Sequence, residues 1–316
     1  MIKYFADWIT YGLLSLSRKG LLAEAINFFI YETIKIFFLL AIIIFMVSFI
    51  RSFLPPEKIR KILSAKRKLY GNTLAALFGI ITPFCSCSAI PLFLGFVEAG
   101  VPLGVTFSFL ISSPMVNEVA LIMLLGLFGW RIALLYTFSG VVIAIISGIV
   151  IGQLKVESLV EDFVYKSKGS KAQDPLKMSL AERVTYARTY TFDIIKQIWP
   201  HVIIGIGIGA WIHGYAPADF LVRYAGRSNW YAVPLVTLIG IPLYSNAAGI
   251  IPLIGVLTEK GVSMGTSLAF MMAVTGLSLP AFMILRKVMK VKLLIIFASI
   301  VGIGIIFTGY LFNLIL

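Results

Sequence analysis

Charged residues are scarce in this chain. They make up 13% of its 316 residues, whereas a soluble domain has about a quarter of its residues charged. Hydrophobic residues make up 59%, and apolar runs such as 25–50 exceed the roughly 18 residues that make a span candidate. The scarcity of charge excludes an ordinary soluble domain and predicts an all-α polytopic membrane protein.

Cysteine and histidine are also rare, with two of each. Two cysteines cannot build a disulfide framework, and His201 and His213 lie too far from them in sequence to suggest a four-ligand zinc site. The sequence contains no GxxxxGK[ST] motif for ATP and no set of nucleophile, base and orienting residue. We therefore expect neither an enzyme nor a cofactor, and no cleavable signal peptide is recognised.

Acidic residues are fewer than basic ones, which gives a formal net charge of +13. The basic residues concentrate in 51–68 and 155–188, and the positive-inside bias predicts that both loops are cytoplasmic. Between apolar segments, EKIRKILSAKRK (57–68) is better explained by this bias than as a nucleic-acid patch. No nucleic-acid partner is expected.

The chain contains an internal repeat. CSCSAIPLFLGFVEAGVPLG (85–104) aligns without a gap to NAAGIIPLIGVLTEKGVSMG (246–265), so that Pro, Glu and Gly recur 161 residues apart. The same spacing aligns 70–79 with 231–240. Coincidence of these residue types indicates a duplication.

The duplication predicts four parts. They are an N-terminal amphipathic helix in the membrane interface (1–24), a first transmembrane repeat (25–154), a basic cytoplasmic loop (155–187) and a second transmembrane repeat (188–316). Residues 2–17 could alternatively cross the membrane as a short span.

Each repeat is predicted to hold a re-entrant helical hairpin. If 70–97 crossed the membrane once, three crossings would place the two basic loops on opposite faces. Its 28 residues are too few to cross twice, since one span needs about 20. A hairpin that returns to the cytoplasmic face satisfies both limits, and the two repeats then have inverted topology, as in many secondary transporters.

Polar residues interrupt the apolar segments at four places: the hairpin tips TPFCSCSAIP (82–91) and PLYSNAAGIIP (242–252), and the broken helices at SSPMVNE (112–118) and AVTGLSLP (273–280). Non-helical backbone at membrane depth requires partners from protein or water, so we expect the four breaks to meet at the midplane. The predicted substrate path is lined by Cys85, Ser86, Cys87, Ser88, Ser113, Asn117, Glu118, Tyr244, Ser245, Asn246 and Thr275.

Cys85 and Cys87 have two interpretations. Cysteine is often an inert buried residue. Both cysteines of the chain lie at one predicted hairpin tip, however, and the second repeat has Asn246 and Ala248 instead. A requirement of the fold should recur in both halves, so the thiols are better explained as ligands of a soft, thiophilic substrate.

Glu118 is an acidic residue within a predicted broken helix. A carboxylate near the bilayer centre costs about 2.5–3.5 kcal/mol on insertion scales. It is interpreted as a proton-coupling or cation-contacting group, with a structural acid bonded to freed backbone as the alternative. Glu32, near the start of a span, is expected to pair with Lys35.

TPFCSCSAIPLFLGFVEAGVPLGVTFSFLISSPMVNE (82–118) resembles the ArsP-like and YraQ-like prokaryotic predicted permeases. The resemblance covers nearly the whole chain and implies a multi-pass protein of the cytoplasmic membrane. Members described as ArsP export trivalent organoarsenicals, and a cysteine pair is implicated in holding the arsenic. By resemblance, Cys85 and Cys87 would be transient ligands of As(III) or another soft metal.

The leading hypothesis is a secondary transporter that exports a small thiophilic solute such as a trivalent organoarsenical. One alternative is a permease for a sulfur-containing or inorganic anion, in which the cysteines are not essential. A second is a membrane redox protein that cycles the CxC pair. The expected partners are a small-molecule or ion substrate and the lipid bilayer, and a homo-oligomer is compatible with the sequence.

Overall fold

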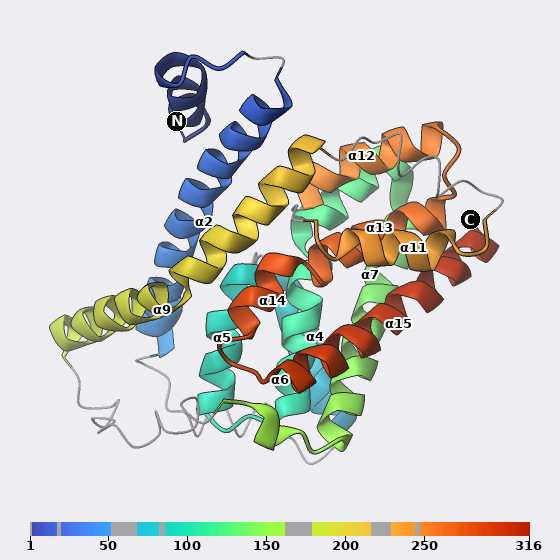
Figure 1. Ribbon diagram of the computed structural model, residues 1–316. Coiled ribbons are helices and arrows are strands. Elements are labelled where there is room, and N and C mark those ends of the chain that lie inside the picture. Colours follow the sequence, from blue (N-terminus) through green and yellow to red (C-terminus); the bar gives the residue numbers. More distant parts are fainter. Residues whose placement is uncertain are drawn as a thin grey trace.

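The computed structural model describes residues 2–17, 20–51, 68–81, 86–161, 179–215, 229–243 and 247–316. Within these ranges the chain is helical and has no strand; Val160 and Met289 form an isolated antiparallel bridge (Figure 1). The helices are α1 (Ile2–Asp7), η1 (Trp8–Leu13), α2 (Leu21–Arg51), α4 (Lys68–Ile81), α5 (Ser86–Glu98), α6 (Leu103–Met115), α7 (Glu118–Gln153), η2 (Glu157–Leu159), α9 (Leu180–Tyr215), α11 (Ala232–Gly240), α12 (Ala247–Glu259), α13 (Met264–Gly276), α14 (Leu279–Leu285) and α15 (Val291–Ile315).

The predicted all-α membrane fold is confirmed. Three described stretches are long and apolar enough to cross a membrane: Glu118–Gln153, Met264–Leu285 and Val291–Ile315. Helices α2 and α9 contain the predicted spans 25–50 and 188–213, and they pack against each other along one side of the molecule (Figure 1).

Several helix boundaries and breaks recur along the chain. Helices α5 and α12 each have 13 residues, as do α6 and α13, and the members of each pair begin 161 residues apart. Helix α7 is kinked at Gly129, whose φ is 84°. The position 161 residues later is Lys290, the N-cap of α15, so the kink in α7 matches the connection between α14 and α15.

Glycines at matched positions allow close helix packing in both halves. Helices α4, α6 and α7 pack together, as do α11, α13 and α15. A Cβ at Gly104 would overlap Gly148 O, and a Cβ at Gly265 would overlap Gly309 O. Lipid gives helices no hydrophobic reason to associate, so such close backbone contacts supply much of the packing energy.

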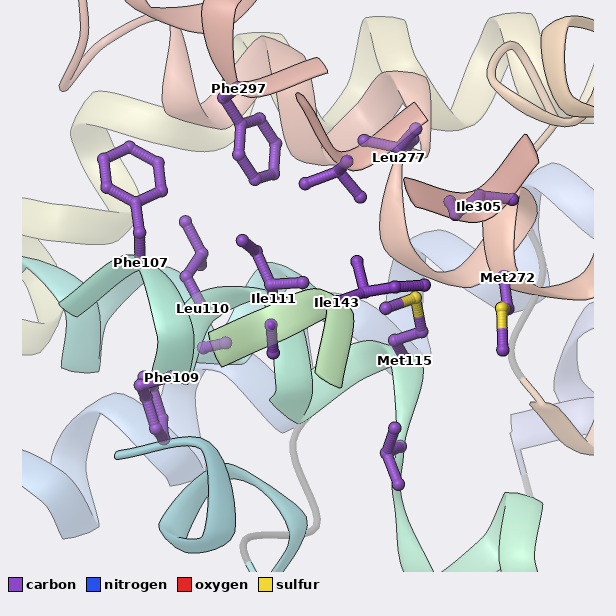
Figure 2. Packing of buried hydrophobic residues seen from close by; sticks show 14 of the residues in the cluster. Phe107, Phe109, Leu110, Ile111, Met115, Ile143, Met272, Leu277, Phe297 and Ile305 are labelled. Carbon is purple, nitrogen blue, oxygen red and sulfur yellow. The ribbon is translucent and has the colours of Figure 1, made fainter. Parts of the chain in front are cut away.

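The two groups of three helices meet through an apolar layer, which Figure 2 shows from close by. Phe107 of α6 lies against Phe297 of α15, with ring centroids 5.6 Å apart. Ile143 of α7 packs on Gly304 of α15, where a Cβ would lie 3.2 Å from Ile143 Cγ2. A polar group inside this layer must therefore find its partner within the protein.

Helix α9 begins at Leu180, within the stretch expected to be a loop. Ser179 N–H donates to the Glu182 carboxylate at 2.7 Å, and Glu182 N–H donates to Ser179 Oγ at 3.4 Å. This reciprocal capping box starts the helix, and its hydrogen bonds hold the pKa of Glu182 below its ordinary value.

The N-terminal segment folds as α1 and the π-helical turn η1, which contact α2. Asn27 Nδ2 of α2 donates to Asp7 Oδ1 at 2.8 Å and so ties this segment to α2. Tyr4, Phe5 and Trp8 are exposed, as aromatic residues at a membrane interface are. The interfacial role of residues 1–24 stays a prediction.

Replacing Gly148 by alanine should destabilise the protein. A Cβ at Gly148 would overlap Ser108 Oγ and lie 2.7 Å from Asn72 Oδ1, and such overpacking costs about 1–3 kcal/mol. In detergent, Gly148→Ala should lower the midpoint of thermal unfolding. Gly126→Ala is the matched control on the same helix, because no described atom lies within 4 Å of its added Cβ. Equal midpoints would contradict the packing described here.

Candidate functional site

The first helix break lies between α6 and α7. Pro114 lacks an N–H, and α6 ends one residue later at Met115. Val116 and Asn117 are extended, and Asn117 Oδ1 accepts the Ala120 N–H at 2.8 Å. Asn117 is therefore the N-cap of α7, and Glu118 is the first residue of that helix.

The second break lies between α13 and α14. Helix α13 ends at Gly276, and Pro280 stands in the first turn of α14. The Leu279 N–H donates to Ile241 O at 2.8 Å. Because Ile241 directly follows α11, this bond joins the second break to the end of α11.

The end of α4 reaches the first break in a similar way. Gly79 lies in the last turn of α4, three residues before Thr82. A Cβ at Gly79 would overlap Ser112 Oγ and lie 3.1 Å from Ser113 N. Because residue 79 is a glycine, the last turn of α4 can lie close to Ser112 and Ser113. The predicted Cys-Ser-Cys tip follows directly in the chain.

The two breaks also meet each other. A Cβ at Gly276 would lie 3.5 Å from Met115 Sδ, and α6 contacts α13. The Tyr136 hydroxyl on α7 donates to Met115 O at 3.0 Å and lies beside the Thr275 side chain. Thr275 Oγ1 itself donates to Met271 O at 2.9 Å. The structure thus brings Thr275 to the first break.

Three buried polar atoms at these breaks have no hydrogen-bond partner in the described part of the chain: Ser113 Oγ, Glu118 Oε2 and Ser278 Oγ. Leaving a buried polar group unpaired costs about 1–3 kcal/mol. A small polar ligand that forms hydrogen bonds with these atoms would remove that cost.

Several predicted site residues lie outside the described residues. They are Cys85, Tyr244, Ser245 and Asn246. Ser86, Cys87 and Ser88 open α5, but their side chains are outside the described set. Among the residues that the structure describes, no group of three His, Cys, Asp or Glu side chains could hold a metal.

Helices α5 and α12 each contact a helix of the other half. Helix α5 contacts α14 of the second half, and α12 contacts α7 of the first. Helix α5 begins within the Cys-Ser-Cys segment and contacts α14, which directly follows the second break. It therefore links this segment to the second half.

The predicted ion pair between Glu32 and Lys35 is present on α2, with a nitrogen–oxygen distance of 2.8 Å.

Sequence reasoning did not single out Tyr136 or Ile241. Tyr136 is fully buried, yet a tyrosine in an apolar helix carries no signal of its own. Its repeat counterpart, 161 residues later, is Phe297. Comparison of the two halves at this position would have revealed a hydroxyl that only the first half has.

Comparisons with known proteins agree with this arrangement. The sequence profile of the family ArsP_1, described as "Predicted permease", matches residues 21–314. UPF0718 protein MJ0584 of Methanocaldococcus jannaschii is 24% identical over 74% of this chain and 81% of that protein. UPF0718 protein YraQ of Escherichia coli is 21% identical over 83% of this chain and 73% of that protein.

A further relative is the "Putative two-component membrane permease complex subunit" of Streptococcus mutans. It is 24% identical over 78% of this chain and 76% of that protein. No solved structure matches this chain.

Removing the cap of α7 should destabilise the first break. Asn117→Ala deletes the acceptor of the Ala120 N–H, and loss of an N-cap costs about 1 kcal/mol. Asn117→Ser is the matched control, because serine is also a good N-cap and occupies the corresponding position 278. The thermal midpoint of the alanine variant should fall below that of the serine variant, and equal midpoints would contradict the capping role.

Proposed function

Because the chain belongs to the predicted-permease family ArsP_1, we propose that it is a secondary transporter that exports a small thiophilic solute, such as a trivalent organoarsenical, across a prokaryotic cytoplasmic membrane. The observation that carries the proposal is the meeting of two helix breaks inside an apolar layer, with Ser113, Glu118 and Ser278 contributing unpaired polar atoms. Broken helices at the midplane are the usual substrate sites of secondary transporters.

The matched helix boundaries support two repeats of inverted topology. The proposed arrangement places 51–68 and 155–188 in the cytoplasm, with hairpin 70–97 entering from that side. It also places Arg286, Lys287, Lys290 and Lys292 in the cytoplasm, although these residues were not used to orient the chain. Three basic loops on one face are consistent with the positive-inside bias.

The proposed substrate ligands are Cys85 and Cys87. Soft thiolates prefer soft ions and arsenic(III). For a trivalent arsenical with one organic group and two hydroxyls, two As–S bonds would replace two As–O bonds and release two water molecules. The contacts of Gly79 with Ser112 and Ser113 support a place for the thiol hairpin beside the first break.

The α2–α9 pair supports an alternating-access mechanism. This pair contacts α5 through α2 and α14 through α9. If the two halves were arranged alike, the equivalents of the α2–α5 and α9–α14 contacts would join α9 to α12 and α2 to α7. Among the described residues, neither of these equivalent contacts is as extensive. The two halves are thus arranged unequally, as a carrier in one of its two end states requires. Exchange of these contacts would give the other state.

Replacing both cysteines by serine should abolish transport of a trivalent methylarsenical into everted vesicles, because serine does not bind arsenic as a thiolate does. Each single variant should lose most of the transport, since one thiolate cannot chelate the arsenic. An unchanged thermal midpoint would show that the fold is retained. Undiminished export by the double variant would refute the thiol role and favour the anion alternative.

Glu118→Gln should uncouple transport from a pH gradient. Glutamine keeps the shape and polarity of the side chain but cannot exchange a proton. In proteoliposomes, the variant should retain counterflow of the methylarsenical and lose accumulation driven by an imposed pH gradient. Glu259→Gln, at the exposed end of α12, is the control that should behave like the wild type. Gradient-driven accumulation by Glu118→Gln would instead assign Glu118 a structural role.

A further inference from the structure

Tyr136 connects the two helix breaks through one buried hydroxyl group. Its side chain is 0% exposed. The hydroxyl donates to Met115 O at 3.0 Å and lies beside the Thr275 side chain. Met115 is the last residue of α6, and Thr275 is the penultimate residue of α13. One side chain therefore contacts both broken helices.

The Met115 carbonyl needs this donor because of the break. In a continuous α-helix it would accept the N–H of residue 119. The chain leaves the helix at Val116 instead, where φ is −125° and ψ is 91°. A carbonyl left unpaired in an apolar layer is costly, and the Tyr136 hydroxyl supplies its hydrogen bond.

Gly140, one turn after Tyr136 on α7, also packs against the first break. A Cβ at Gly140 would overlap Val116 Cγ2 and lie 3.9 Å from Met115 Cγ. Tyr136 and Gly140 are four residues apart and so lie on one face of the helix. That face contacts Met115 by a hydrogen bond and Val116 by close packing, so a shift of α7 must move the break with it.

The hydroxyl is not required by the architecture. At the matched position in the second half, Phe297 is also buried, and its ring packs against Phe107 and Phe282. An aromatic ring alone is sufficient there. The hydroxyl of Tyr136 is therefore specific to the half that also has Glu118 and the two cysteines.

We propose that Tyr136 is a positioning residue that holds the first break in register with the second and thereby sets the affinity for substrate. Asn117 and Glu118 lie two and three residues after Met115, so the position of the Met115 carbonyl influences where these side chains begin. The inference rests on the proposed transport function. Loss of one hydrogen bond of about 1.4 kcal/mol corresponds to a tenfold change in affinity.

The test compares Tyr136→Phe with Tyr310→Phe in proteoliposomes, using the trivalent methylarsenical as the probe. The Tyr310 hydroxyl also donates to a backbone carbonyl, Trp230 O, at 2.5 Å, but it lies near the end of α15, away from the breaks. Tyr136→Phe should raise the transport KM about tenfold with a maximal rate close to wild type, whereas Tyr310→Phe should leave both constants unchanged. A KM for Tyr136→Phe equal to that of the wild type would overturn the proposal.

A second measurement needs no substrate. Hydrogen exchange of the amides of 114–121 should be faster in Tyr136→Phe than in the wild type, and Tyr310→Phe should not change it. Unchanged exchange would refute the positioning role, whatever the transport result. If the wild type fails to transport the arsenical, the proposed substrate is wrong, and the exchange measurement still decides whether Tyr136 holds the break.

Discussion

Every backbone group that leaves a helix inside the apolar layer must find a partner within the protein, and the arrangement around the two breaks depends on this constraint. Three contacts meet it directly: Asn117 accepts the Ala120 N–H, Tyr136 donates to the Met115 carbonyl, and Ile241 accepts the Leu279 N–H. The first contact starts α7, the second joins α7 to the end of α6, and the third joins the end of α11 to the start of α14. The constraint that makes a broken helix costly thus also brings α7 and α11 to the breaks.

Features that recur in both halves can be separated from those that occur once. The glycine contacts, the breaks and the hairpin helices recur 161 residues apart, and they satisfy the packing demands of helices in lipid. The thiols, Glu118 and the Tyr136 hydroxyl occur only in the first half. Since the second half has the same architecture without them, the proposed transporter would use them for its solute.

The broken helices could be predicted from sequence because their signals are local. Each break has a proline beside polar residues, with Pro114 one residue before the end of α6 and Pro280 in the first turn of α14, and both breaks lie where SSPMVNE and AVTGLSLP occur. The start of α9 was missed, because 155–187 was expected to be a loop, although Ser179 and Glu182 have the spacing of a capping box. The breaks were expected to meet, but the bonds of Tyr136 and Ile241 could not be predicted, because they join residues that only the tertiary fold brings together.

The placement of α5 bears on how a tightly held solute could be released. Two thiolates bind arsenic(III) strongly, so a carrier must weaken this binding in one of its states. Helix α5 carries the Cys-Ser-Cys segment at its N-terminus and contacts both α2 and α14, which belong to different halves. In the proposed transporter, a movement of one half relative to the other must therefore shift α5. Such a shift changes the geometry of the thiols, whereas a site built within one rigid half would keep the same affinity on both faces of the membrane.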